Sequence, residues 1–133
     1  MASDVASLVR ESLVLLGCDE GKISQFDHHS AIELSFSSVP SIYISDNDGD
    51  VWVWSRFVDC GLDKFMSNSQ KLLPILIKYH PWSRTGQVQI GEDSSDIEIK
   101  AMIHGDYCFD AENFSKALNG FYGELCGICE IMK

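Results

Sequence analysis

DNDGDVWVWSRFV, residues 46–58, is the stretch that decides the fold. Its first four residues hydrogen-bond their own backbone or tolerate positive φ, which predicts a tight turn between two strands. Alternation then divides the following residues between two faces, Val51, Val53, Ser55 and Phe57 on one and Trp52, Trp54, Arg56 and Val58 on the other. Both faces are largely apolar, whereas antiparallel strands usually keep one face wet. We therefore expect a mid-sheet strand, covered on one face by a helix of this chain. The other face is covered either by the same fold or by another chain.

Two further strands precede the turn. Residues 31–36 alternate Ile32, Leu34 and Phe36 with polar side chains, which is typical of a half-buried strand. Serines and Pro40 interrupt this pattern, and residues 41–45 then place Ile42 and Ile44 on one side of a second short strand. With the strand that follows the turn, these segments predict a three-stranded meander.

The N-terminal segment is predicted to be helical from residue 3 to residue 16. Apolar side chains recur there at helical spacing, with Ser3 as a candidate N-cap and Gly17 as the stop. Val14 and Leu15 widen the apolar stripe beyond one buried face, so we expect part of this helix to contact a partner. Residues 18–30 have the composition of a loop.

A second helical pattern runs from about residue 62 to residue 79 and contains Pro74. A proline inside a helix removes one hydrogen bond, so we expect a kink, or a helix that starts late, near residues 67–69. Apolar residues cover most of its circumference, namely Leu72, Leu73, Ile75, Leu76 and Ile77. A helix that is apolar all round is buried all round, which is easier in a small domain if a second subunit supplies one wall.

Two strands and a helix complete the chain. Residues 86–90 and 96–104 are the predicted strands, joined by the polar turn GEDSSD, and the last helix runs from its N-cap Asp110 to Met132. The predicted order is α-β-β-β-α-β-β-α. This places the chain in the α+β class, as an antiparallel sheet with helices packed on it, and predicts a single domain over residues 1–133.

The composition limits the class of function. A net charge of -10 repels nucleic acid and anionic membranes. The N-terminus has no positively charged region, and no apolar run approaches 18 residues, so we expect neither a signal peptide nor a membrane-spanning helix, but a cytosolic protein. The 5 cysteines are odd in number and irregularly spaced, which indicates reduced thiols rather than a disulfide framework.

No motif predicts catalysis or a cofactor. The acidic turn at residues 46–50 lacks the carboxylates that a calcium loop needs at its ends. Cys126 and Cys129 lie near the C-terminal end of a helix, where the helix dipole does not activate a thiol, so we interpret them as structural. The histidines lack the spacing of a zinc site, and no nucleophile-elbow or phosphate-loop motif is present. We therefore expect no enzyme, no metal and no cofactor. A non-catalytic adaptor or inhibitor that binds a folded partner remains the alternative function.

Several segments in a fixed order carry a family resemblance. They are LVRESL (8–13), DHHSAI (27–32), SIYIS after Pro40 (41–45), DGDVWVW (48–54) and FSKALNGFY (114–122). The chain resembles the class IB type III secretion chaperones, the InvB/SpaK group of bacterial cytosolic proteins, from about Leu8 to Tyr122.

The resemblance implies a homodimer that binds the non-globular N-terminal segments of several secreted effectors. It would keep them soluble and secretion-competent and aid their delivery to the export apparatus, with the secretion ATPase or sorting platform as a further partner. The family's central helix forms much of the dimer interface, which maps onto Leu72, Leu73, Ile75, Leu76 and Tyr79. Pro74 departs from the family pattern.

The mechanism follows from the physics of peptide recognition. An extended segment would place apolar side chains into pockets between the first helix and the sheet, and would add a strand to an exposed edge. The acidic turns around residues 46–50 and 92–96 would steer basic segments toward the dimer. The expected effector-binding residues are Leu8, Val9, Leu15, Ile32, Leu34, Phe36, Ile42, Ile44, Trp52 and Trp54.

Overall fold

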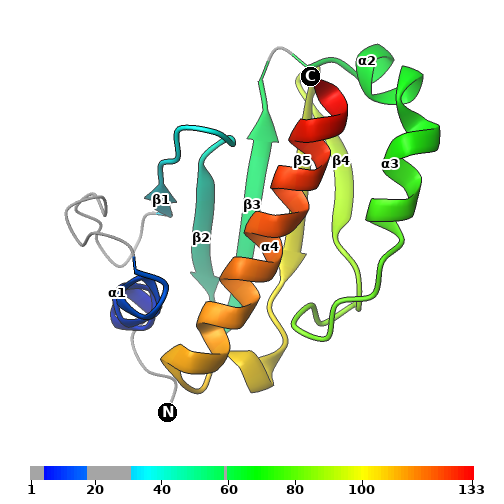
Figure 1. The fold of residues 1–133 in the computed structure, drawn as a ribbon. Coiled ribbons are helices and arrows are strands. Elements are labelled where there is room, and N and C mark those ends of the chain that lie inside the picture. The colour runs from blue at the N-terminus through cyan, green and yellow to red at the C-terminus, as the bar shows by residue number, and fades with distance from the viewer. Residues whose placement is uncertain (1–4, 18–30, 59) are drawn as a thin grey trace.

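The computed structural model describes residues 5–17, 31–58 and 60–133. In this part of the chain five antiparallel strands form one sheet in the order β1-β2-β3-β5-β4 (Figure 1). The strands are β1 (Ile32–Leu34), β2 (Ile42–Asn47), β3 (Asp50–Phe57), β4 (Gln89–Asp93) and β5 (Asp96–Met102). β3 lies in the middle, between β2 and β5, as the sequence predicted.

The helices follow the predicted order with one subdivision. They are α1 (Val5–Leu15), α2 (Leu62–Ser67), α3 (Ser69–Leu76), the short 3-10 helix η2 (Gly105–Tyr107) and α4 (Ala111–Met132). Figure 1 shows α4 crossing the sheet, with α1 near β1 and with α2 and α3 near β4. The α+β prediction is confirmed. The Ser3 cap and the loop predicted over residues 18–30 lie outside the described residues.

The β2–β3 and β4–β5 hairpins each have a two-residue turn in which both residues have positive φ. Asp48 and Gly49 have φ of 54° and 93°, and the Gly49 N–H donates to Asp46 Oδ1 at 2.8 Å. Ser94 and Ser95 have φ of 51° and 75°. Positive φ at both central positions matches the right-handed twist of the strands.

The strand predicted at residues 86–90 was misplaced. β4 spans Gln89–Asp93 and β5 begins at Asp96, so four of the six residues of GEDSSD lie in strands and only its two serines form the turn. β4 is an edge strand with mostly exposed side chains, and such a strand carries no apolar alternation that would reveal it. The last strand also ends earlier than predicted, at Met102 rather than His104, although Ile103 forms an isolated bridge with Ser83.

The central helical segment breaks at Asn68 rather than kinking at Pro74. The Asn68 side-chain amide donates to the Lys64 carbonyl at 2.9 Å. The backbone carbonyl of Asn68 accepts from the backbone N–H groups of Lys71 and Leu72. One residue thus ends α2 and begins α3, which confirms a helix that starts near residue 69. Pro74 is exposed near the end of α3, where its missing N–H removes a single hydrogen bond. α3 ends at Leu76, earlier than the predicted Tyr79.

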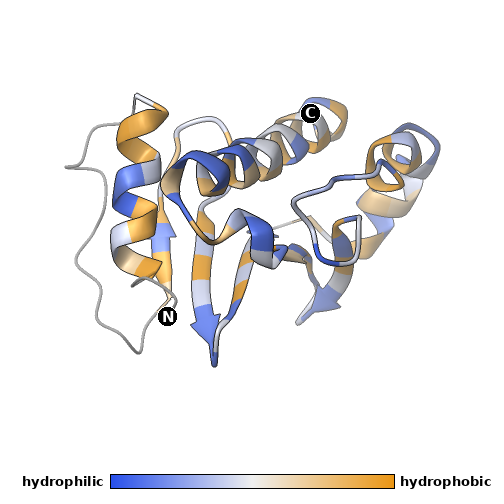
Figure 2. Cartoon of the chain, turned by 90° about the horizontal axis from the view of Figure 1, so that it is seen from below, coloured by the Kyte–Doolittle hydropathy of each residue, from blue (hydrophilic) through white to orange (hydrophobic). Residues whose placement is uncertain are grey.

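The two faces of the sheet differ. α1, α3 and α4 lie on the same side of the sheet (Figure 2), and the β3 residues that face them, Val51, Val53, Ser55 and Phe57, are buried. Ser55 is accommodated there because its hydroxyl donates to the Ser41 carbonyl at 2.9 Å. On the opposite face Trp52, Trp54 and Arg56 are half-buried, and no helix of the described residues covers them.

The connection between α3 and β4 contacts α4 at Gly120, through the side chain of Trp82. Trp82, 5% exposed, packs edge-on against Phe121 with ring centroids 6.3 Å apart. A Cβ on Gly120 would lie 2.3 Å from Trp82 Nε1. The absence of a side chain at residue 120 is therefore what allows the indole to contact the helix backbone.

We predict that Gly120→Ala lowers the free energy of unfolding by about 1–3 kcal/mol, because the indole must move away from α4. The matched control is Gly123→Ala on the same helix, where nothing lies within 4 Å of the added Cβ. That change should leave stability unchanged or raise it by about 0.5–1 kcal/mol through helix propensity. Urea unfolding of both variants measures the difference, and equal effects would contradict the Trp82 contact.

Candidate functional site

The predicted effector-binding residues fall into two groups that the sheet separates. Six of them lie in the core between the helices and the sheet and are between 0 and 4% exposed: Leu8, Val9, Ile32, Leu34, Ile42 and Ile44. Trp52 and Trp54 lie on the opposite, open face, because Trp54 pairs in register with Tyr43 whereas Ile44 pairs with Val53. Leu15 is 60% exposed, and Phe36 is half-buried. The predicted set is therefore not one continuous surface.

An apolar groove lies between α1, the β1–β2 region and α4. It has a volume of about 300 Å³ and is lined by Leu13, Leu16, Leu34, Phe36, Ile42, Leu118, Asn119 and Tyr122. The Phe36 and Tyr122 rings meet at 5.1 Å with an interplanar angle of 50°. Six of the eight lining residues are aliphatic or phenyl side chains, so the groove suits apolar side chains of a ligand. We name this surface the α1–α4 groove.

The sequence predicted three of the groove residues, Leu34, Phe36 and Ile42, and missed the others. Leu13 and Leu16 belong to the stripe of α1, whose periodicity does not distinguish a core position from a groove wall. Leu118, Asn119 and Tyr122 lie in the segment FSKALNGFY, which carried the family resemblance. That segment was the available signal for the α4 wall.

The groove adjoins an open sheet edge. Among the described residues β1 pairs with β2 alone, through Ile32, Glu33 and Leu34. The outer edge of β1 therefore presents backbone groups that an added strand can pair with. Leu34 belongs both to this edge strand and to the groove lining. A single extended segment can thus hydrogen-bond to β1 and place side chains in the groove.

The open face of the sheet carries a second hollow of about 570 Å³. It is lined by Pro40, Ser41, Tyr43, Trp54, Arg56 and Val58. Tyr43 and Trp54 stack with centroids 5.6 Å apart, and the Tyr43 hydroxyl donates to Glu33 at 3.4 Å. Burial, followed by the Glu33 carboxylate, raises the pKa of Tyr43. This face is aromatic and charged in alternation, unlike the apolar groove.

Charged side chains border the aromatic residues of the open face. Arg56 forms an ion pair with Asp93 of the edge strand, and Lys100 lies over the Trp52 ring, with Nζ 5.6 Å from the centroid. A cation over an indole contributes about 0.5–1 kcal/mol at an exposed site. These contacts keep a sheet face without a helix compatible with water.

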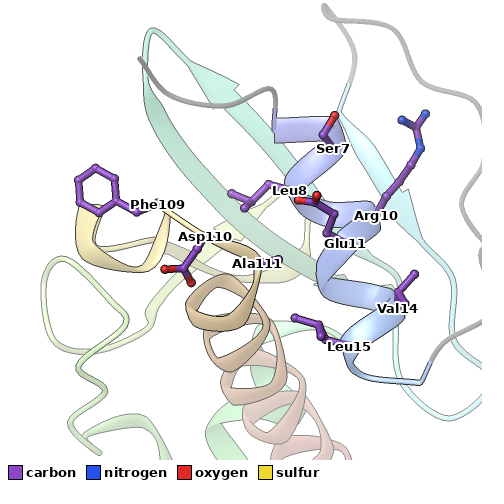
Figure 3. Close-up of a pocket in the computed structure, with 9 residues that line it drawn as sticks. All are labelled: Ser7, Leu8, Arg10, Glu11, Val14, Leu15, Phe109, Asp110 and Ala111. Atoms are coloured by element: carbon purple, nitrogen blue, oxygen red, sulfur yellow. The ribbon is translucent and has the colours of Figure 1, made fainter.

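A third hollow lies on the other flank of α1, beside the start of α4 (Figure 3). It has a volume of about 750 Å³, and the side chains of Val14, Leu15 and Phe109 border it. These side chains are 52, 60 and 78% exposed. Leu8, Val9 and Leu13 of the α1 stripe are buried, whereas Val14 and Leu15, which widen it, remain uncovered within the described residues.

The predicted dimer-interface residues are only partly buried in this chain. Leu72 is buried, Ile75 and Leu76 are half-buried, and Leu73 and Tyr79 are 57 and 70% exposed. A hollow of about 280 Å³ separates this helix from β4, whose Ile90 is 43% exposed. One chain by itself therefore leaves the outer wall of this helix uncovered, and burial of that wall by a second subunit stays a prediction.

Burial raises the pKa of three described thiols, Cys60, Cys108 and Cys129. Burial raises the pKa of Cys108 to about 11, and burial, followed by the neighbouring Cys126, raises the pKa of Cys129. A thiol with a raised pKa is a poor nucleophile and metal ligand. No group of three or more His, Cys, Asp or Glu side chains in the described residues is arranged to hold a metal ion. No described helix is long and apolar enough to cross a membrane.

Comparison with known sequences identifies the class of protein that has this fold and these apolar surfaces. The Invasion protein B family matches residues 17–94. The surface presentation of antigens proteins SpaK of Salmonella typhimurium (strain LT2) and of Salmonella typhi are both 38% identical over 122 residues, which cover 92% of this chain and 90% of each SpaK. The chain therefore belongs to the Invasion protein B family, the InvB/SpaK type III secretion chaperones, which are non-catalytic proteins of secretion and virulence. The resemblance stated from the sequence is confirmed.

Two solved structures share the fold at low sequence identity. One chain of the heterodimeric ExoU-SpcU complex from the type III secretion system of Pseudomonas aeruginosa matches with a TM-score of 0.52 and 16% identity, covering 93% of both chains. YbjN from E. coli, described as a putative transcription regulator, matches with a TM-score of 0.58 and 12% identity, covering 99% of this chain and 90% of YbjN. At these identities the likeness concerns the fold alone.

We predict that Trp54→Ala leaves most of the stability intact, because this side chain is half-buried on an uncovered face. A fully buried tryptophan would cost about 3–5 kcal/mol instead. If the open face holds a partner, the variant should weaken binding by about 2 kcal/mol or more, as truncation of a hot-spot residue does. Thermal melting beside a binding titration separates the two cases, and a greatly lowered melting temperature with unchanged affinity would place Trp54 in the core.

Proposed function

We propose that this chain acts in the bacterial cytosol as a homodimer that binds the non-globular N-terminal segments of several secreted effectors. It keeps these segments extended, soluble and secretion-competent and aids their delivery to the export apparatus, where the secretion ATPase or sorting platform receives them. The observation that carries the proposal is the α1–α4 groove lying directly beside the open edge of β1.

Each half of this arrangement contributes a different part of the recognition. Backbone hydrogen bonds to β1 give affinity that does not depend on the partner's sequence, which suits a chaperone with several effectors. Apolar side chains seated between Phe36 and Tyr122 then select segments with a suitable spacing of large residues. Ordering a disordered segment costs conformational entropy, and a surface that combines an edge and a groove offsets it over a long contact.

Leu34 and Ile42 contribute to the same site from beneath. They are buried side chains that form the floor of the groove, so their role is to shape it. Ile32 and Ile44, which pair two register positions away on the same face, fix β1 against β2 and thereby the position of the edge. The expected binding residues in the core thus act by placing the residues that contact the partner.

The homodimer is supported by the uncovered side of α3. Leu73, Ile77 and Tyr79 are each more than half exposed, and Met66 of α2 and Ile90 of β4 extend the same apolar region. A second copy would bury these side chains, at about 25 cal/mol for each Å² of apolar surface. The groove and α3 lie near opposite edges of the sheet, so dimerisation leaves the groove accessible (Figure 1).

For the groove, we predict that Phe36→Ala weakens binding of an effector N-terminal segment at least about tenfold, equal to about 1.4 kcal/mol. The matched control is Phe109→Ala, which removes an exposed aromatic side chain outside the groove. Isothermal titration with a synthetic segment measures both affinities. Equal losses, or no loss in either variant, would count against the groove.

Limited proteolysis distinguishes the alternative function. A chaperone protects a segment that is cleaved readily when free, whereas an adaptor or inhibitor binds a partner that is already folded and resistant. Protection of the isolated N-terminal segment by this chain is the expected result. Binding only to a folded domain would favour the adaptor instead.

For the dimer, we predict that Leu73→Asp yields a folded monomer, because the side chain is exposed in one chain but would carry an unpaired charge into the interface. Lys71→Asp, at an exposed position about 200° away around α3, should remain dimeric. Sedimentation equilibrium reports both masses. A monomeric wild type at micromolar concentration would reject the dimer.

A further inference from the structure

We propose that the buried pair His80–Glu124 is a pH-dependent latch that holds the connection between α3 and β4 against α4. Its Nε2–Oε1 distance is 3.0 Å, and the two side chains are 11 and 4% exposed. The α1–α4 groove and the open sheet face make no use of this pair. The latch joins the connection that follows the proposed dimer helix to the longest helix of the fold.

The surface of α4 is shaped to receive the connection. Gly120, Glu124 and Gly127 recur at helical spacing and so lie on one face of α4. Trp82 occupies the space above Gly120, and Ile75 of α3 approaches Gly127, where an added Cβ would lie 3.3 Å from Ile75 Cδ1. Glu124 therefore lies between two close contacts. We call the packed contact of α4 with α3 and the α3–β4 connection the seam, and Glu124 is the ionisable group at its centre.

The connection itself is ordered by backbone contacts around His80. The His80 N–H donates to the Gly86 carbonyl at 2.6 Å, the Ser83 N–H to the His80 carbonyl at 3.1 Å, and the Gly86 N–H to the Ser83 carbonyl at 3.0 Å. The imidazole also contacts the Trp82 ring, with centroids 4.8 Å apart. A change at Glu124 is thus transmitted to a compact loop and not to one flexible side chain.

The carboxylate is incompletely satisfied. Glu124 Oε1 contacts His80, but no hydrogen-bond partner among the described residues reaches the buried Oε2. An ionised carboxylate in such a place costs more free energy than a protonated one, because its second oxygen has lost water without gaining a donor. The geometry therefore favours the seam when Glu124 carries a proton and disfavours it when the proton leaves.

Few charges act on the latch. Burial raises the pKa of Glu124, while the hydrogen bond and charge of His80 and then Lys78 lower it, and burial prevails. Arg84 of the same connection contacts Asp50, and the His104 ring accepts from the Asp106 backbone. On α4 the residues one turn to either side, Gly120, Phe121, Gly127 and Ile128, carry no charge. Stability should therefore fall as pH rises. A carboxyl whose pKa is raised on folding stabilises the fold below its unfolded pKa, and this contribution is lost as pH rises through the folded pKa.

The first test compares melting temperatures of the full chain from about pH 5 to about pH 8. Relative to Glu124→Gln, which cannot ionise, the wild type should lose melting temperature progressively across this range, because its raised pKa makes ionisation of the folded state unfavourable. The matched control Glu130→Gln removes an exposed carboxylate of α4 that contacts Lys133, and its difference from the wild type should stay flat. A flat or rising difference for Glu124→Gln overturns the latch.

A second measurement stands even if the variant does not fold. Carbon NMR of the Glu124 carboxyl in the wild type should show a pKa above the ordinary range of glutamate, and His80→Leu should raise this pKa further by removing the hydrogen bond and the charge that lower it. Titration at or below the ordinary value rejects the proposal. Amide exchange in the loop, at Gly86 above all, should lose protection as pH rises, after correction for base catalysis, and should not do so in Glu124→Gln.

The consequence for assembly rests on the proposed homodimer, because the latch seats the end of α3. Sedimentation should show weaker dimerisation at the higher pH in the wild type and no such change in Glu124→Gln. A chain that is monomeric at every pH would reject the dimer while leaving the melting and NMR tests valid. A stable dimer with pH-independent melting differences would reject the latch alone.

Discussion

The pairing of β3 with β2 on one side and β5 on the other is the constraint on which the rest of the structure depends. The two-residue turn at Asp48 and Gly49 fixes the register of the first pairing, and a slip of one residue would exchange the two faces of the strand. In the observed register Val51, Val53 and Phe57 face the helices. This arrangement creates one apolar layer for α1 and α4 and leaves the tryptophans outside it.

Close packing on α4 is the second organising feature. Helix α4 crosses the sheet and receives α1 on one flank and the α3–β4 connection on the other (Figure 1). Gly120 permits the contact with Trp82 of the connection, Gly127 lies against Ile75 of α3, and Tyr122 on another side of the helix contributes to the groove. The same helix therefore supports the proposed binding surface and the seam that seats α3.

The uncovered apolar surfaces and the net charge of the chain together suit the proposed binding of an extended segment. The chain carries a net charge of -10, yet the lining of the α1–α4 groove has no charged residue. Charge elsewhere keeps a protein with exposed Leu, Ile and Phe side chains soluble, because like-charged molecules repel one another. The groove can then remain apolar without a ligand. In the proposed function an extended segment would gain from burying large side chains there, and the acidic hairpin tips would attract segments that carry basic residues.

The sequence alone determined the element order, the central position of residues 50–57, the start of a helix near residue 69 and the family, because these depend on local periodicity, turn residues and motifs in a fixed order. Only the tertiary structure decided that Ile32, Leu34, Ile42 and Ile44 are core or groove floor while Trp52 and Trp54 lie on the open face. Alternation separates two faces of a strand but does not say which one the helices cover. Likewise β4 was predicted three residues too early because an exposed edge strand has little apolar pattern to fix its bounds. His80 meets Glu124 beside Gly120, where the missing side chain lets Trp82 of the connection approach α4.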